Sequence, residues 1–262
     1  MSAIILDGAI VHYEALGRGR PIVFLHGWIG SWRYWINAMQ VVSTSFRAYA
    51  LDLFGFGDTA REPQRYSLER QAALIDQFLN EMGIGKIAIV GHGLGALVGF
   101  WFASQWPRSV DRIMVVNCPL RPASLHSRLQ TASLNDLVDW LGNRTPEYNT
   151  ALADALKADP KAIPPSIEGL RTNNFFVTVR QLGIPTLLVY GENDPLVTMP
   201  TFDESTTLPL MIQQIVLEDT GHFPMIDHPV RFNRLLTDFL ALDSGMSPHE
   251  LQLKEEWKRR VR

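Results

Sequence analysis

The chain lacks most of the features that mark secreted, membrane or nucleic-acid-binding proteins. It has one cysteine, Cys118, among 262 residues, so no intramolecular disulfide can form and a cytoplasmic location is expected. Asp7 interrupts the short apolar run at the N-terminus, which argues against a signal peptide. No apolar stretch has the length needed to span a bilayer. The net charge of −3 provides no basic surface for nucleic acid.

What is present is the composition of a globular domain, with 46% hydrophobic and 19% charged residues. Short β-rich runs alternate with segments of helical periodicity, which predicts a single α/β domain with a mostly parallel, doubly wound sheet. The expected strands are Ala9–Ala15, Ile22–Leu25, Phe46–Leu51, Lys86–Val90, Arg112–Asn117, Thr186–Tyr190 and Gln213–Leu217, and the expected helices are Ser67–Met82, Leu94–Gln105 and Val230–Leu240.

Two segments depart from this alternation. Residues 119–180 contain several prolines, two or three helical patches and no convincing strand, which indicates a helical lid or cap inserted over the carboxyl edge of the sheet. Residues 247–262 carry charges of both signs and end in a basic run. We interpret this tail as a solvated C-terminal helix or frayed end in preference to a basic docking segment.

The segment directly after the run Lys86–Val90 reads Gly91-His92-Gly93-Leu94-Gly95. This is the pattern G-x-S-x-G of a nucleophile elbow, with glycine where the serine stands. The turn between strand and helix holds its central residue at positive φ, which costs a residue with a side chain about 1–3 kcal/mol. Glycine adopts that conformation without penalty. The local pattern therefore fits the elbow, but the Oγ atom that would form a covalent intermediate is missing.

Four further segments accompany the elbow. Phe24-Leu25-His26-Gly27-Trp28 is a strand ending in His-Gly-x, and Asp52-Leu53-Phe54-Gly55-Phe56-Gly57-Asp58 is a loop of the form D-x-x-G-x-G-x-S with Asp58 in the serine's place. Later come Gly191-Glu192-Asn193-Asp194 and Thr220-Gly221-His222. Together, and in this order, these segments resemble the α/β-hydrolase superfamily of the serine-hydrolase type.

The resemblance implies a role for several residues. Position 93 is the nucleophile position, Asp194 the acid and His222 the base, in the order Ser…Asp…His that this fold uses. The backbone N–H groups of Trp28 and Leu94 would form the oxyanion hole. An imidazole can accept a proton near neutral pH, and a carboxylate fixes its tautomer and stabilises the imidazolium. His26 and His92 are interpreted as residues that shape the loops, and Cys118 as a small core residue.

The function expected from the resemblance is hydrolysis of an ester or a related acyl or C–C bond in a small apolar substrate. Gly93 predicts impaired activity, because removal of a triad nucleophile lowers turnover by roughly 10⁶. We hypothesise that His222 activates a water molecule in place of the serine. The glycine can be natural or an engineered change made to trap substrate; no tag or scar accompanies it, which favours the natural origin.

Alternative functions remain open. One is a non-catalytic binder or receptor for a small apolar or aromatic molecule, and another is a cofactor-free lyase or oxygenase that uses His222 and Asp194. The same glycines also fit G-x-G-x-x-G/A, the dinucleotide-binding fingerprint, but no acidic residue follows at the end of the next strand. We therefore expect no cofactor, and we see no metal-ligand cluster. The aromatic residues expected to line a ligand pocket are Trp28, Trp32, Phe54, Phe175 and Phe176, whereas Trp35 is expected in the core.

Overall fold

The computed structural model describes residues 2–143 and 145–251. Its centre is one eight-stranded sheet with the order β1-β2-β4-β3-β5-β6-β7-β8. The pairs β1–β2 and β2–β4 are antiparallel, and every other neighbouring pair is parallel. The strands are β1 (Ser2–Leu6), β2 (Ala9–Gly17), β3 (Arg20–Leu25), β4 (Phe46–Leu51), β5 (Ile87–His92), β6 (Val110–Val116), β7 (Thr186–Gly191) and β8 (Ile212–Leu217).

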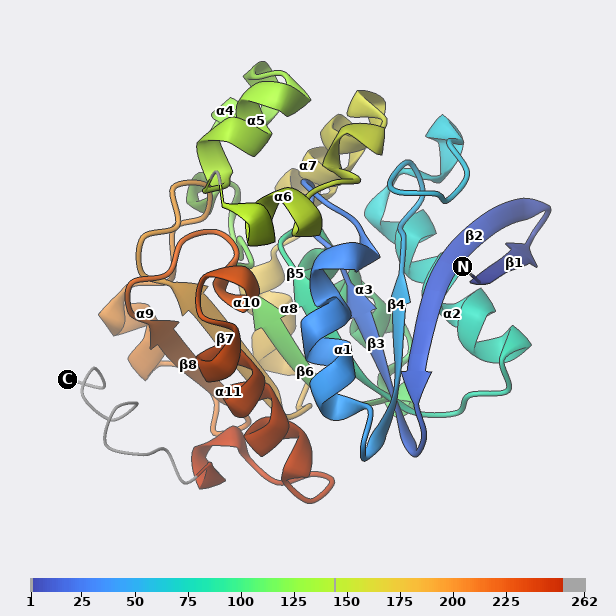
Figure 1. Ribbon diagram of the computed structural model, residues 1–262. Helices are drawn as coiled ribbons and strands as arrows, with labels where there is room; N and C mark the ends of the chain where they lie inside the picture. The colour runs from blue at the N-terminus through green and yellow to red at the C-terminus, as the bar shows by residue number, and fades with distance from the viewer. Residues whose placement is uncertain (1, 144, 252–262) are drawn as a thin grey trace.

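Helices cover both faces of the sheet and extend beyond one edge (Figure 1). α1 packs against α11 on one face, while α2, α3 and α8 pack together on the other. The helices are α1 (Ile36–Val42), α2 (Leu68–Glu81), α3 (Leu94–Gln105), α4 (Arg128–Thr131), α5 (Leu134–Leu141), α6 (Pro146–Ala151), α7 (Ile163–Thr172), α8 (Phe175–Gln181), α9 (Phe202–Thr206), α10 (Pro224–Asp227) and α11 (Pro229–Ala241). This arrangement confirms the predicted α/β fold with a mostly parallel, doubly wound sheet.

The sequence patterns predicted strands β2 to β8 and missed β1. β1 pairs with β2 through a tight hairpin, in which Asp7 and Gly8 both have positive φ values, 47° and 78°. Asp-Gly is a strong hairpin signal, because both residues tolerate the left-handed conformation of a two-residue turn. β1 lies at the sheet edge and leaves Ile5 exposed, so its sequence lacks the pattern of a buried core strand.

Close approach of α3 to the centre of the sheet sets the position of the elbow. A Cβ atom on Gly95 would lie 2.3 Å from the carbonyl oxygen of Leu25 in β3, and a Cβ on Gly91 would lie 2.7 Å from the carbonyl oxygen of Gly95. Only glycine fits at either position. The N–H of Gly95 donates to the carbonyl of His26 at 2.9 Å, which ties the start of α3 to the loop after β3.

Residues 119–180, which we call the cap segment, connect β6 to the region before β7. Their described part holds α4 to α7 and most of α8 and contains no strand. In Figure 1, α4 to α7 lie together above the upper ends of the central strands. That the cap segment acts as a lid stays a prediction. Of the predicted tail, residues 252–262 lie outside the described residues. Within the described part of the chain, no helix is long and apolar enough to cross a membrane.

Candidate active site

The predicted nucleophile position lies in a sharp strand-to-helix turn. Gly93 lies between β5 and α3 with φ 49° and ψ −106°, a conformation that side-chain-bearing residues rarely adopt. Its N–H donates to the carbonyl of Val116, and its carbonyl accepts from Leu97 in the first turn of α3. The structure thus has a sharp turn at this glycine, and the role of the turn as a nucleophile elbow stays a prediction.

The predicted acid and base form a hydrogen-bonded pair. Asp194 Oδ2 lies 2.9 Å from His222 Nδ1, and both side chains are almost completely buried. The other carboxylate oxygen, Oδ1, accepts the N–H of Leu196 at 2.8 Å, which fixes the carboxylate in the loop after β7. Since Asp194 accepts the Nδ1 proton, Nε2 of the neutral His222 carries a lone pair. Among the described residues, this Nε2 has no hydrogen-bond partner.

Asn117, which follows β6, connects the loops that carry Asp194 and His222, the two residues that we call the dyad. Its Oδ1 accepts the N–H of Gly191 at 2.8 Å, and its Nδ2 donates to the carbonyl oxygens of Gly221 at 3.2 Å and His222 at 2.9 Å. The side chain is completely buried, and the backbone has a positive φ of 46°. The sequence analysis missed this role. An asparagine at the end of a central strand was the available signal, because asparagine tolerates positive φ better than most residues.

Two other histidines organise the loops around the elbow. His26 Nε2 accepts the N–H of Leu53 at 3.0 Å, so its Nδ1 carries the proton and donates to the carbonyl of Gly27 at 2.8 Å. Tyr34 Oη accepts the N–H of Gly27 and donates to His92 Nδ1 at 3.0 Å. Burial, assisted by the neighbouring imidazole of the dyad, lowers the pKa of His92 well below its usual value. A neutral ring that accepts at Nδ1 carries its proton on Nε2.

The predicted oxyanion donors belong to residues next to Gly93, one in sequence and one in space. Leu94 is the first residue of α3, where the backbone N–H has no partner within the helix. Trp28 follows the His26-Gly27 loop and is completely buried. Its ring borders the elbow: a Cβ added to Gly93 would lie 3.2 Å from Cζ3 and 3.3 Å from Cε3 of the indole. The assignment of the two N–H groups as an oxyanion hole stays a prediction.

Comparison with known proteins gives a consistent picture. The profile of the family described as "alpha/beta hydrolase fold" matches residues 20–147. The chain has the α/β-hydrolase fold. Its sequence is 24% identical over 259 residues to a 2-hydroxy-6-oxo-6-(2'-aminophenyl)hexa-2,4-dienoic acid hydrolase of Metapseudomonas resinovorans, covering 89% of this chain and 88% of the relative. It is 29% identical over 244 residues to the putative carbamate hydrolase RutD of Escherichia coli O17:K52:H18, covering 84% and 86% of the two chains.

Solved structures resemble this α/β-hydrolase-fold chain along most of its length. The meta-cleavage product hydrolase CumD from Pseudomonas fluorescens IP01, solved as a mutant with acetates, superposes with a TM-score of 0.78 at 22% identity, covering 92% of this chain and 97% of CumD. A serine-to-glycine mutant of the N-acyl homoserine lactonase AidH gives a TM-score of 0.79 at 20% identity, covering 91% and 96%. At these identities the likeness establishes the fold.

The aromatic residues predicted to line a pocket have different surroundings in this α/β-hydrolase fold. Phe54 is buried beneath Arg65, and Trp32 is partly buried with Arg33 over its ring. Phe175 packs against Trp101 of α3, and the ring centroid of Phe176 lies 4.0 Å from the guanidinium carbon of Arg121. These four rings pack against arginine and tryptophan side chains, and their contacts provide no support for a role at the dyad.

Ring contacts close to the dyad come from residues that the sequence analysis did not select. Phe223 follows His222 in sequence, and its ring packs edge-on against that imidazole at 4.9 Å between centroids. Tyr148 of α6 packs edge-on against Phe223 and donates to Asp227 Oδ1 at 2.6 Å. Asp227 Oδ2 accepts the N–H of Gly221. A residue of the cap segment thereby contacts the histidine loop, which no short-range sequence pattern could indicate.

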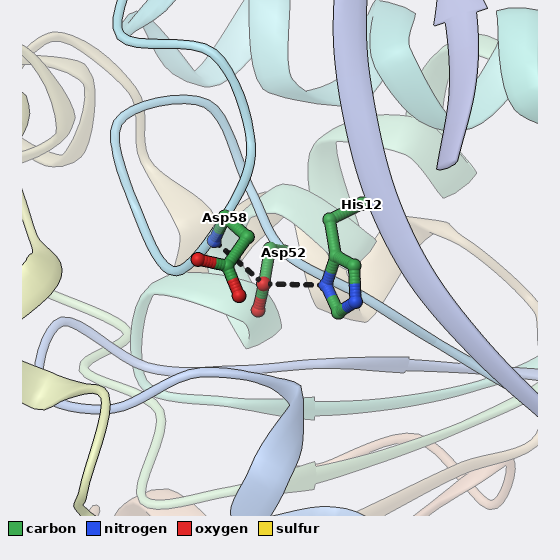
Figure 2. Close-up of side chains that lie close together, drawn as sticks. All are labelled: His12, Asp52 and Asp58. Carbon is green, nitrogen blue, oxygen red and sulfur yellow. Dashed lines mark hydrogen bonds and ion pairs between the residues drawn. The ribbon is translucent and has the colours of Figure 1, made fainter. Parts of the chain in front are cut away.

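One group of side chains has the composition of a metal site. Oxygen and nitrogen atoms of His12, Asp52 and Asp58 lie within 4.8 Å of one another (Figure 2). Asp52 Oδ2 accepts from His12 Nδ1 at 2.8 Å and from the N–H of Asp58 at 3.1 Å, and Oδ1 accepts the N–H of Trp32 at 2.9 Å. Lys157 Nζ lies 2.8 and 3.1 Å from the two oxygens of Asp58.

These bonds already occupy Nδ1 of His12 and the carboxylate oxygens of Asp52 and Asp58. Burial by itself lowers the pKa of His12, but the hydrogen bond to Asp52 and the charges of Asp52, Glu14 and Asp58 outweigh it and raise that pKa. The cluster therefore favours a protonated imidazole, which repels a cation. Its contacts join β2 and the loop after β4 to Lys157 of the cap segment, so we interpret it as structural.

Proposed function

We propose that the chain is a hydrolase in which a water molecule, activated by His222, takes the part of the absent serine. The substrate is an ester or a related acyl or C–C compound of small, largely apolar character. The observation that carries the proposal is the unpartnered, buried Nε2 of His222, whose ring is oriented by Asp194. The hydrolase names of the sequence relatives support the reaction class.

The reaction on an ester is a direct attack without an acyl-enzyme. The water oxygen forms a bond to the carbonyl carbon while its proton passes to His222 Nε2. Negative charge that develops on the carbonyl oxygen is stabilised by the N–H groups of Trp28 and Leu94. The bond between the carbonyl carbon and the alcohol oxygen then breaks, and the imidazolium returns the proton to the leaving alcohol. Asp194 stabilises the imidazolium throughout.

The expected rate is low. In a serine triad, loss of the nucleophile leaves roughly 10³–10⁴-fold acceleration over water from the oxyanion hole and binding. A general base correctly placed for water contributes about 10²–10⁴-fold. We therefore expect turnover well below that of a complete triad, but measurable with an activated ester.

The test is hydrolysis of p-nitrophenyl acetate by the unchanged chain, His222→Ala, Asp194→Asn and Gly93→Ser. The proposal predicts slow hydrolysis by the unchanged chain that falls by at least about tenfold in His222→Ala. It also predicts no acyl adduct on the unchanged chain by mass spectrometry during turnover. Activity equal in the unchanged chain and His222→Ala would refute it, as would a covalent acyl intermediate in the unchanged chain.

The second candidate is a binding protein for a small apolar ligand. It is favoured by one observation: position 93 supplies no nucleophilic atom, although the surrounding loops are held by buried hydrogen bonds. Under this alternative, p-nitrophenyl acetate is not turned over by any His222-dependent route. Gly93→Ser then acquires activity that the unchanged chain lacks.

A further inference from the structure

The ring of Trp28 is the neighbour that limits the space at the nucleophile position. Contacts of a Cβ atom at 3.2–3.3 Å are tighter than ordinary van der Waals contact, so a side chain on Gly93 requires the indole to move by a few tenths of an ångström. The next atom within reach, Gly27 Cα, lies at an ordinary 3.7 Å. The crowding therefore comes from one side chain.

A hydrogen bond to the cap segment holds that indole in place. Trp28 Nε1 donates to Ser166 Oγ at 2.8 Å, and Ser166 Oγ donates in turn to the carbonyl of Ile163 at 2.6 Å. Both Trp28 and Ser166 are completely buried. Ser166 lies near the start of α7, so this hydrogen bond connects the loop after β3 to a helix of the cap segment.

α7 itself is packed tightly enough to resist displacement. A Cβ on Gly169, one turn after Ser166, would lie 2.7 Å from Cδ1 and 2.8 Å from Cγ of Leu68 at the start of α2. The face of α7 that carries Ser166 and Gly169 therefore contacts α2 at close range as well as Trp28. An indole that must shift away from Gly93 has to strain or break its bond to Ser166, because α7 has little freedom to follow.

We propose that Trp28, positioned by Ser166, determines the size of the group accepted at position 93, and that Gly93 and Trp28 are a matched pair. The indole leaves room for a small attacking molecule such as water, but crowds a side-chain nucleophile. The inference rests on the proposed function, since it explains how the site is sized for water. Trp28 is a specificity-determining residue in this scheme, and Ser166 is a positioning residue that acts through it.

The experiment compares how fast an introduced serine reacts in different surroundings. Four proteins are prepared: Gly93→Ser alone, and Gly93→Ser combined with Trp28→Phe, with Ser166→Ala or with Trp35→Phe. The last is the matched control, because Trp35 is also a completely buried tryptophan, packed against Phe24 and Phe232. The probe is diethyl p-nitrophenyl phosphate. The serine Oγ forms a bond to phosphorus, its proton passes to His222, and the bond from phosphorus to p-nitrophenolate breaks.

Release of p-nitrophenolate gives the rate, and mass spectrometry confirms one diethylphosphoryl group per chain. We expect Trp28→Phe and Ser166→Ala each to raise the rate of the Gly93→Ser protein by at least about tenfold, and Trp35→Phe to leave it within about twofold. Equal rates in all four proteins would overturn the inference, and so would a rise of equal size with Trp35→Phe. A substitution that acted by displacing Asp194 or His222 would change the pH profile of labelling. The inference expects the four proteins to share one pH profile.

A stability cycle keeps the inference testable if a serine variant fails to fold. Gly93→Ala is measured by urea unfolding in the unchanged chain and in the Trp28→Phe background. The inference predicts a smaller fall of the midpoint in the Trp28→Phe background, and an equal fall in both would contradict it. Neither experiment uses the activity of the unchanged chain. An unchanged chain that hydrolyses no p-nitrophenyl acetate would therefore refute the proposed function and leave these comparisons intact.

Discussion

Replacement of Asn117 is expected to separate the two loops that carry the dyad. In Asn117→Ala, the N–H of Gly191 and the carbonyl oxygens of Gly221 and His222 lose their side-chain partner. A typical buried hydrogen bond contributes about 0.5–1.5 kcal/mol net, and a buried group left unsatisfied costs about 1–3 kcal/mol. Together the lost bonds amount to about 3 kcal/mol of unfolding free energy. Alanine at φ 46° adds about 1 kcal/mol relative to asparagine.

The assay is urea unfolding followed by circular dichroism, with Asn117→Gly and Asn80→Ala as companions. Asn117→Gly loses the same bonds but tolerates the positive φ, so it is expected to be about 1 kcal/mol more stable than Asn117→Ala after allowance for chain entropy. Asn80 is exposed and its side chain donates to Asp76 on its own helix, so Asn80→Ala is expected to change stability by less than about 0.5 kcal/mol. A loss below about 1 kcal/mol in Asn117→Ala would refute the assigned role.

Two further predictions concern packing and pH. Gly95→Ala is expected to lower the unfolding free energy by more than about 3 kcal/mol in a urea titration, because its Cβ would lie 2.3 Å from the Leu25 carbonyl oxygen, whereas Gly85→Ala, with open space around it, is expected to stay within about 0.5 kcal/mol. Because the pKa of His12 is raised in the folded chain, the stability from its pairing with Asp52 is complete below the unfolded pKa of about 6.5 and is lost as pH rises through the higher folded pKa. The unchanged chain is therefore expected to lose its stability advantage over His12→Gln as pH rises, measured by unfolding across this range. An advantage that grows with pH would contradict the assigned ion pair.

The elements and the motif order could be predicted because they depend on local patterns. Strand β5, the elbow at Gly93 and the loops of Asp194 and His222 each carry their own signal within a few residues. The partners of the site could not be predicted in this way. Ser166 approaches Trp28 across 138 positions of sequence, and nothing near Ser166 distinguishes it from a helix-surface serine. Long-range contacts of this kind depend on how the cap segment packs.

Asp58 is another residue whose role depends on long-range contacts. The family pattern places a serine there, and the sequence alone gives no reason for a carboxylate. In the folded chain, Asp58 pairs with Lys157, and Lys157 also lies 3.0 Å from Asp154, which contacts Arg33 at 2.7 Å. The changed residue therefore belongs to a set of charges between the loops of the domain and the cap segment. The ion pairs of Asp58 form only when the cap segment packs against these loops, so the sequence alone could not predict them.

The free-energy cost of burying an unpaired imidazole nitrogen bears on whether the site has a chemical role. Within the described residues, the Nε2 atom of His222 is buried without a hydrogen-bond partner, at a cost of about 1–3 kcal/mol. Apolar side chains of similar size would remove that cost if the site served only as a scaffold. Gly93 avoids the strain that a side chain would have at this turn, yet the His222 imidazole is buried in the same site at a cost in free energy. This combination favours a site that still handles protons or a polar ligand over a fold that has lost its chemistry altogether.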